Sequence, residues 1–113
     1  MLKHFALSEF ACSCCGRVHM DQGFLLKLDK ARGKAGVPFN INSGYRCPTH
    51  NREIGSTSEN HTSGHAVDIG CTGGPERICI LRGLIAVGFR RIGIRKDFIH
   101  VDDMDKVESC WLY

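Results

Sequence analysis

The sequence lacks an apolar run long enough to cross a membrane, and it also lacks internal repeats, low-complexity tracts and linkers. Charge of one sign is not dominant, because the formal net charge is only +3. A small positive charge is compatible with binding to an anionic polymer, but it does not identify a partner. The hydrophobic content of 42% is that of an ordinary globular protein. We therefore expect one domain over residues 1–113, a monomer that binds neither nucleic acid nor a membrane.

The N-terminal residues also form no recognisable signal peptide. Glu9 interrupts them before an apolar region has been built. We therefore expect a protein that is made in the cytoplasm, where thiols stay reduced. The seven cysteines are accordingly predicted to be free thiols and not a disulfide framework.

Cysteine is abundant for this length, and three of the residues lie close together. Cys12, Cys14 and Cys15 are followed by His19, and thiolates with an imidazole suit zinc. The spacing is not a pair of Cys-x-x-Cys motifs, so a loop with free thiols is the plainer interpretation. We expect the remaining cysteines to be small buried hydrophobic residues. These are Cys47, Cys71, Cys79 and Cys110.

Apolar periodicity predicts two helices. In residues 21–35 apolar side chains recur at three- and four-residue steps. A second helix is predicted from about Pro75 to Gly88, because proline suits the first helical position and glycine the end. A short helical turn is expected at Leu7–Phe10, with Ser8 as its cap.

Alternation of apolar and polar residues predicts strands at residues 37–43, 66–70, 89–94 and 97–102. The last two are expected to form an antiparallel hairpin. Residues 47–59 are predicted to form a loop with one helical turn, and residues 110–113 an apolar tail that docks on the body. This order of elements fits an α+β domain, a small antiparallel sheet with helices packed on one side.

Two histidines and a carboxylate have the chemistry of a metal site. Asp68 lies in the predicted strand 66–70, where a carboxylate is costly to bury unless it is paired or bound to metal. His61 precedes that strand, and His100 lies in the apolar run 98–102. A catalytic zinc site has three protein ligands of these types and one open position. The sequence therefore predicts Zn²⁺ at His61, Asp68 and His100, with His65 as a weaker candidate ligand.

Two further residues could act beside such a metal. Asp97 begins the predicted strand that carries His100, where the turn can direct its carboxylate towards the metal. Arg46 follows the predicted strand 37–43 and can point into the same site. The plainer interpretation of a lone arginine is a solvated surface residue.

Motifs in several parts of the chain share one pattern. They are His61-x6-Asp68, Asp97-x2-His100-x-Asp102, Ser43-Gly44-Tyr45-Arg46 with Asn51, and Phe5-x-Leu7-Ser8-Glu9-Phe10. The combination resembles the M15 family of zinc peptidases, and most closely its small D-Ala-D-Ala carboxypeptidase type, which includes phage endolysins. The resemblance implies a hedgehog/DD-peptidase-like α+β fold, with residues 1–113 forming a single zinc peptidase domain.

The resemblance also implies a role for each residue. His61, Asp68 and His100 would bind Zn²⁺, Asp97 would be the general base towards the zinc-bound water, and Arg46 would stabilise the oxyanion. Zinc chemistry, proton transfer to a carboxylate and a cationic oxyanion donor are consistent with these roles. The implied activity is hydrolysis of peptidoglycan stem peptides, either as a D-Ala-D-Ala carboxypeptidase or as an L-Ala-D-Glu endopeptidase.

Two positions depart from the family pattern. Glu59 stands where many members have serine, although Ser58 is adjacent, and Arg95 stands where some have histidine. We interpret Arg95 as a residue of the hairpin turn.

Other functions and origins stay open at this point. A non-catalytic zinc-binding module on the same fold, as in hedgehog signalling domains, is the main alternative. A regulatory domain that binds metal only through the three clustered cysteines and His19 is another. An enzyme of this kind would act on the cell wall after phage lysis or from a virion, and a bacterial housekeeping role is equally open.

Overall fold

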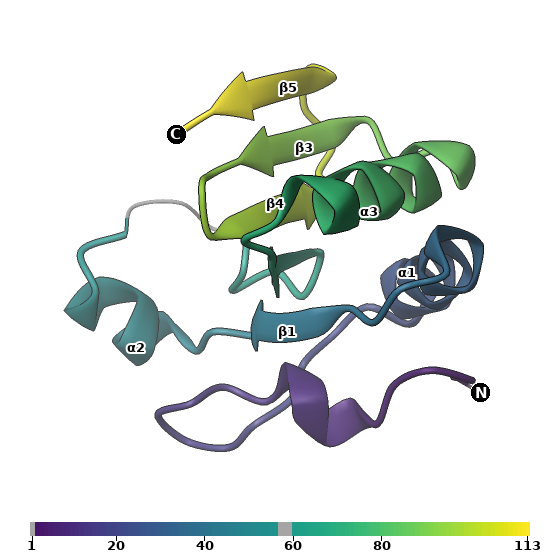
Figure 1. Ribbon diagram of the computed structural model, residues 1–113. Helices are drawn as coiled ribbons and strands as arrows, with labels where there is room; N and C mark the ends of the chain where they lie inside the picture. The colour runs from purple at the N-terminus through teal and green to yellow at the C-terminus, as the bar shows by residue number, and fades with distance from the viewer. Residues whose placement is uncertain (1, 57–59) are drawn as a thin grey trace.

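The computed structural model describes residues 2–56 and 60–113, so Ser58 and Glu59 lie outside the described residues. The described chain forms a five-stranded sheet in the order β1-β2-β4-β3-β5, with two long helices packed together beside it (Figure 1). The strands are β1 Asn40–Ser43, β2 Ala66–Gly70, β3 Arg91–Ile94, β4 Phe98–Asp102 and β5 Ser109–Leu112. The helices are α1 Gln22–Ala35, α2 Pro48–Glu53 and α3 Gly74–Ala86, with a 3₁₀ turn η1 at Leu7–Phe10. The predicted α+β class is confirmed.

The two predicted helices are present, but α3 begins one residue before Pro75 and has Val87, and not Gly88, as its C-cap. The Asp21 carboxylate accepts a hydrogen bond from the Phe24 N–H at 2.9 Å at the start of α1, and Gly36 ends the helix with φ 71°. At η1 the prediction of Ser8 as the cap is wrong. The Glu9 side chain is longer than that of serine, and its carboxylate instead accepts a hydrogen bond from the Ala6 N–H at 2.7 Å.

The C-terminal residues form a strand and are more than a docking tail. Strand β5 pairs with β3 in parallel, whereas the other neighbouring pairs are antiparallel. The chain leaves β4 beside the start of β3, and the Ser109 N–H donates to the Arg90 carbonyl at 2.9 Å. Because β5 starts at the same end as β3, the two strands run in the same direction.

The core lies between one face of the sheet and the pair α1 and α3. It contains fully buried side chains from all of these elements, among them Phe24, Leu28, Val67, Ile69, Ile80, Leu84, Ile99 and Val101. The two helices touch closely at Gly83, where a β-carbon would lie 2.4 Å from the Ala31 carbonyl oxygen. None of the described helices has the length and apolar character needed to cross a membrane.

Burying one face of the sheet determines which side chains point the other way. Val67 and Ile69 of β2 face the core, so Asp68 between them faces the opposite side. Ile99 and Val101 of β4 also face the core, so His100 between them faces the opposite side. Asp68 and His100 are direct partners in the register of these two antiparallel strands. The fold therefore brings two of the three predicted ligands together on the sheet face away from the helices.

Candidate metal centre

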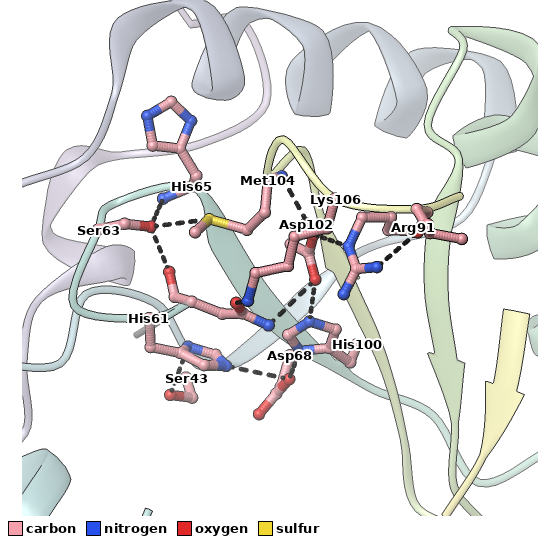
Figure 2. Close-up of polar contacts among 12 residues, drawn as sticks. Ser43, His61, Ser63, His65, Asp68, Arg91, His100, Asp102, Met104 and Lys106 are labelled. Carbon is pink, nitrogen blue, oxygen red and sulfur yellow. Dashed lines mark hydrogen bonds and ion pairs between the residues drawn. The ribbon is translucent and has the colours of Figure 1, made fainter. Parts of the chain in front are cut away.

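The three predicted ligands converge at one point. Asp68 Oδ1 lies 2.9 Å from His100 Nδ1 and 3.4 Å from His61 Nε2 (Figure 2). All three donor atoms lie within 4.8 Å of one another. His61 and His100 are buried, with exposed fractions of 6% and 3%. Asp68 lies in the middle of β2, His100 lies opposite it on β4, and His61 comes from the segment that precedes β2.

These residues fit a zinc ion. At zinc–nitrogen and zinc–oxygen distances of about 2.1 Å, the ligand atoms of a tetrahedral site lie about 3.4 Å apart. The observed separations of 2.9 and 3.4 Å are close to that value. Two imidazole nitrogens and one carboxylate oxygen are also a donor set of the catalytic kind, because they leave a fourth position open.

The second nitrogen of each histidine is held by a buried partner. His100 Nε2 lies 2.7 Å from Asp102 Oδ2, and His61 Nδ1 donates to the Gly44 carbonyl at 2.9 Å. These bonds fix the tautomers and leave His100 Nδ1 and His61 Nε2 free to bind a metal. The sequence motif contained Asp102, but its role as the partner of His100 was not predicted. The available signal was its position two residues beyond a ligand, on the same face of the strand.

Asp102 is itself fully buried and is satisfied by several donors. The Arg91 Nε–H donates to its Oδ1 at 2.7 Å (Figure 2). The Asn60 amide donates to its Oδ2 at 3.2 Å. The Met104 N–H adds a third hydrogen bond at 3.1 Å. A buried carboxylate with this many donors stays ionised and keeps a fixed position.

The charges of the centre stabilise one another in the metal-free protein. Burial raises the pKa of Asp68, but hydrogen bonds with His100 and His61 outweigh it and hold that pKa below its usual value. Burial likewise opposes the charge on Asp102, yet its bonds with His100 and Arg91 lower the pKa. For His100 burial lowers the pKa, and the bonds with Asp102 and Asp68 raise it above the usual value. A cation is thus favoured at this point of the structure.

Arg46 is connected to the centre by hydrogen bonds through one intervening residue, Ser43. Its Nη2–H donates to Ser43 Oγ at 3.1 Å, and that hydroxyl lies 3.3 Å from His61 Nδ1. Its Nη1–H donates to Asn51 Oδ1 at 3.1 Å. A small hollow beside it is lined by Ala11, Ser13, Asn42, Ser43, Gly44, Tyr45, Arg46 and His50. The structure therefore places the arginine close to the predicted ligand His61, while its catalytic role stays a prediction.

Asp97 is not part of the converged group. Its side chain is 54% exposed and pairs with Arg95, whose Nε lies 3.4 Å from its Oδ1. The Cys71 N–H donates to the Asp97 carbonyl at 3.0 Å, which ties this residue to the end of β2. Arg95 lies between β3 and β4, as expected of a hairpin-turn residue. The role of Asp97 as general base stays a prediction.

The weaker histidine candidates lie elsewhere. His65 Nδ1 pairs with Asp103 Oδ1 at 2.7 Å, and its Nε2 lies 3.9 Å from Asp21 Oδ1. His19 packs against Tyr45, with ring centroids 5.1 Å apart. Neither residue belongs to the group of His61, Asp68 and His100.

The cysteines also differ from expectation in two respects. Cys47, and not His19, joins Cys12, Cys14 and Cys15, because the fold brings the start of α2 against the cysteine loop. Cys110 and Cys79 are not the buried hydrophobic residues that the sequence predicted, because Cys110 is exposed on the edge strand β5 and Cys79 is only half-buried. All of the cysteines are free thiols, as predicted.

On its open sheet face this α+β domain thus carries two imidazoles and a carboxylate, the donor set of a catalytic-type metal centre. The chain belongs to the peptidase M15 family, whose sequence model matches residues 3–102. M15 peptidases are zinc-dependent, and the matched range includes every residue of the centre. No curated protein matches the chain significantly.

Proposed function

We propose that this protein is a zinc-dependent peptidase that hydrolyses peptide bonds in the stem peptides of bacterial peptidoglycan. The observation that carries the proposal is the convergence of His61, Asp68 and His100, with both histidines oriented by buried acceptors. Structural zinc sites are closed by four protein ligands, whereas this group supplies three. Membership of the M15 family supports peptide hydrolysis as the reaction.

When bound, zinc acts as a Lewis acid that polarises a carbonyl and lowers the pKa of a water molecule to near neutrality. The protein supplies the other parts. The Arg46 guanidinium, held by Ser43 and Asn51, presents a cationic donor for the negative oxygen that develops on the scissile carbonyl. Its restraint reduces the entropy that would be lost on binding that oxygen.

Asp97 is the proposed general base and proton carrier to the leaving amine. Both side chains of its ion pair with Arg95 are exposed to solvent, so breaking this pair costs little free energy. The carboxylate can therefore turn from Arg95 towards the substrate when a peptide binds. Catalytic contacts are often long in a substrate-free enzyme and tighten only in the complex.

The ligand assignment is tested by His100→Ala, with His65→Ala as the matched control. Loss of one of three ligands should abolish hydrolysis and the zinc bound at this centre, whereas the control should keep both, because His65 pairs with Asp103 outside the centre. Zinc content and muropeptide hydrolysis are the measurements. Wild-type hydrolysis by His100→Ala would rule the proposed centre out.

The bond that is cut is tested with defined muropeptides, analysed by mass spectrometry with and without a chelator. Loss of a terminal D-Ala identifies a carboxypeptidase, and cleavage between L-Ala and D-Glu identifies an endopeptidase.

The exposed position of Asp97 favours one alternative function, a zinc-binding module without catalysis. Zinc-loaded protein that leaves every muropeptide intact would establish that alternative.

A further inference from the structure

A second cluster of metal-type donors lies close to Arg46 in the chain. The sulfur atoms of Cys12, Cys14, Cys15 and Cys47 all lie within 4.8 Å of one another. The first three come from the loop after η1, and Cys47 is the residue before α2. Because Cys47 is distant from the other three in sequence, only the folded chain assembles this group.

The spacing of the sulfurs suits a metal better than a disulfide. Cys14 Sγ and Cys47 Sγ are 3.6 Å apart. A disulfide bond is about 2.05 Å long, whereas the sulfurs of a tetrahedral zinc site with bonds of about 2.3 Å lie about 3.8 Å apart. Four thiols gathered within 4.8 Å of one another have the donor number and type of a closed zinc site.

The backbone around the cluster is arranged to support thiolates. The Cys47 N–H donates to Cys12 Sγ at 3.4 Å, and the His50 N–H donates to Cys47 Sγ at 3.4 Å. Hydrogen bonds of this kind stabilise negative charge on sulfur ligands. The loop is closed by hydrogen bonds from Cys12 N–H to the Arg17 carbonyl and from Gly16 N–H to the Cys12 carbonyl, both 2.8 Å. Gly16 has φ 72°, a conformation that glycine adopts without strain.

Burial divides the four residues into two pairs. Cys12 and Cys47 are buried, whereas Cys14 and Cys15 are exposed. An ion can therefore reach the cluster from solvent while half of its coordination shell is already fixed by the fold. Soft thiolate donors in a tetrahedral set select zinc over the hard cations.

We propose that Cys12, Cys14, Cys15 and Cys47 bind a structural zinc ion, separate from the centre formed by His61, Asp68 and His100. Four thiolates leave no open position, so this ion binds no substrate. It links the cysteine loop to the segment that carries Gly44 and Arg46. That segment already contacts η1, because the Tyr45 N–H donates to the Phe10 carbonyl at 2.8 Å. The proposal does not depend on peptidase activity.

The test is zinc content together with the absorption spectrum of the cobalt-substituted protein. The variants are Cys14→Ser and Cys15→Ser, with Cys110→Ser as the matched control because Cys110 is also exposed but lies on β5. Each cluster variant should lose about one zinc ion per chain and the thiolate-to-cobalt charge-transfer band. The control should keep both. A His61→Ala/His100→Ala double variant should lose the other ion and keep the charge-transfer band.

Four outcomes would overturn the proposal. One is wild-type cobalt protein without a thiolate charge-transfer band, which is informative even if the serine variants do not fold. Another is unchanged zinc content in Cys14→Ser and Cys15→Ser. A third is a Cys14–Cys47 disulfide without zinc in protein purified under reducing conditions. Iron in place of zinc would overturn the identity of the ion. Failure of muropeptide hydrolysis would leave this site unaffected.

Discussion

At the scale of single residues, Asp102 is the most constrained polar side chain at the metal centre. It is fully buried and accepts hydrogen bonds from Arg91, Asn60 and the Met104 N–H while it orients His100. A buried charge is tolerated only when it is paired and hydrogen-bonded, which is the case here. It therefore fixes the ring of His100, a predicted ligand, and in the proposed centre it does not need to touch the metal.

Asp102→Asn should weaken zinc binding by about 10- to 100-fold, because the amide keeps the shape but loses the charge that orients His100. The affinity is measured by competition with a chromophoric chelator, after circular dichroism has shown that the variant is folded. Asp103→Asn is the matched control, since its carboxylate pairs with His65 and not with a ligand. Equal zinc affinity of Asp102→Asn and the wild type would contradict the assignment.

The metal-free protein should lose stability as the pH rises past neutrality. Burial lowers the pKa of His100, but its bonds with Asp102 and Asp68 raise it overall, above the unfolded value of about 6.5. The stabilisation from charged His100 is complete below the unfolded pKa and is lost as the pH rises through the folded pKa. In a chelator, Tm should fall as the pH rises above about 6.5 and through the raised pKa of His100. The His100→Gln variant should lack this pH-dependent stabilisation. Profiles of Tm against pH that run parallel for the variant and the wild type would contradict the prediction.

At the scale of elements, α1 and α3 pack closely against each other at Gly83. Gly83 allows it, because a β-carbon there would lie 2.4 Å from the Ala31 carbonyl oxygen and 2.8 Å from the Ala35 β-carbon. The backbone of α1 cannot move aside without disturbing the buried Leu28 and Phe24. The requirement for glycine at position 83 follows from helix packing and not from helix propensity.

Gly83→Ala should lower the free energy of unfolding by about 1–3 kcal/mol, because overpacking outweighs the gain in helix propensity. Gly74→Ala is the matched control in the same helix, since a β-carbon at that position meets nothing within 4 Å. It should be neutral or slightly stabilising. Urea denaturation measures both values. Equal stability of the two variants would show that α1 and α3 can separate without cost.

At the scale of the whole molecule, the two long helices cover one face of the sheet and the metal centre lies on the other. The predicted ligands come from β2, β4 and the segment before β2, so an ion bound there would join parts of the chain that are distant in sequence. An ion that binds only the native arrangement stabilises the whole domain.

Removing zinc should therefore lower Tm as well as abolish hydrolysis. At a free zinc concentration of 100 times Kd, each site contributes about 2.7 kcal/mol to the free energy of unfolding. Differential scanning calorimetry with and without EDTA measures the change, and added zinc should restore Tm where magnesium does not. The fall should be smaller in His100→Ala, which has already lost one site. An unchanged Tm in EDTA would contradict binding at either site.

Local sequence information was sufficient for the donor types, for the helices α1 and α3 and for the strands β1 to β4, but not for β5. Periodicity and caps predicted α1 and the strand pair β3 and β4, because those signals depend on neighbouring residues. The ligands His61, Asp68 and His100 were predicted from their chemistry and spacing, and the structure brings them together.

Which distant residues meet became apparent only in the folded chain. Asp102 is the partner of His100 because both lie on the open face of β4, and Gly44 is the acceptor for His61 through a contact across the chain. Cys47 replaces His19 beside the clustered cysteines for the same reason. Such contacts depend on how the sheet, its register and the loops pack together, and no local sequence pattern records that packing.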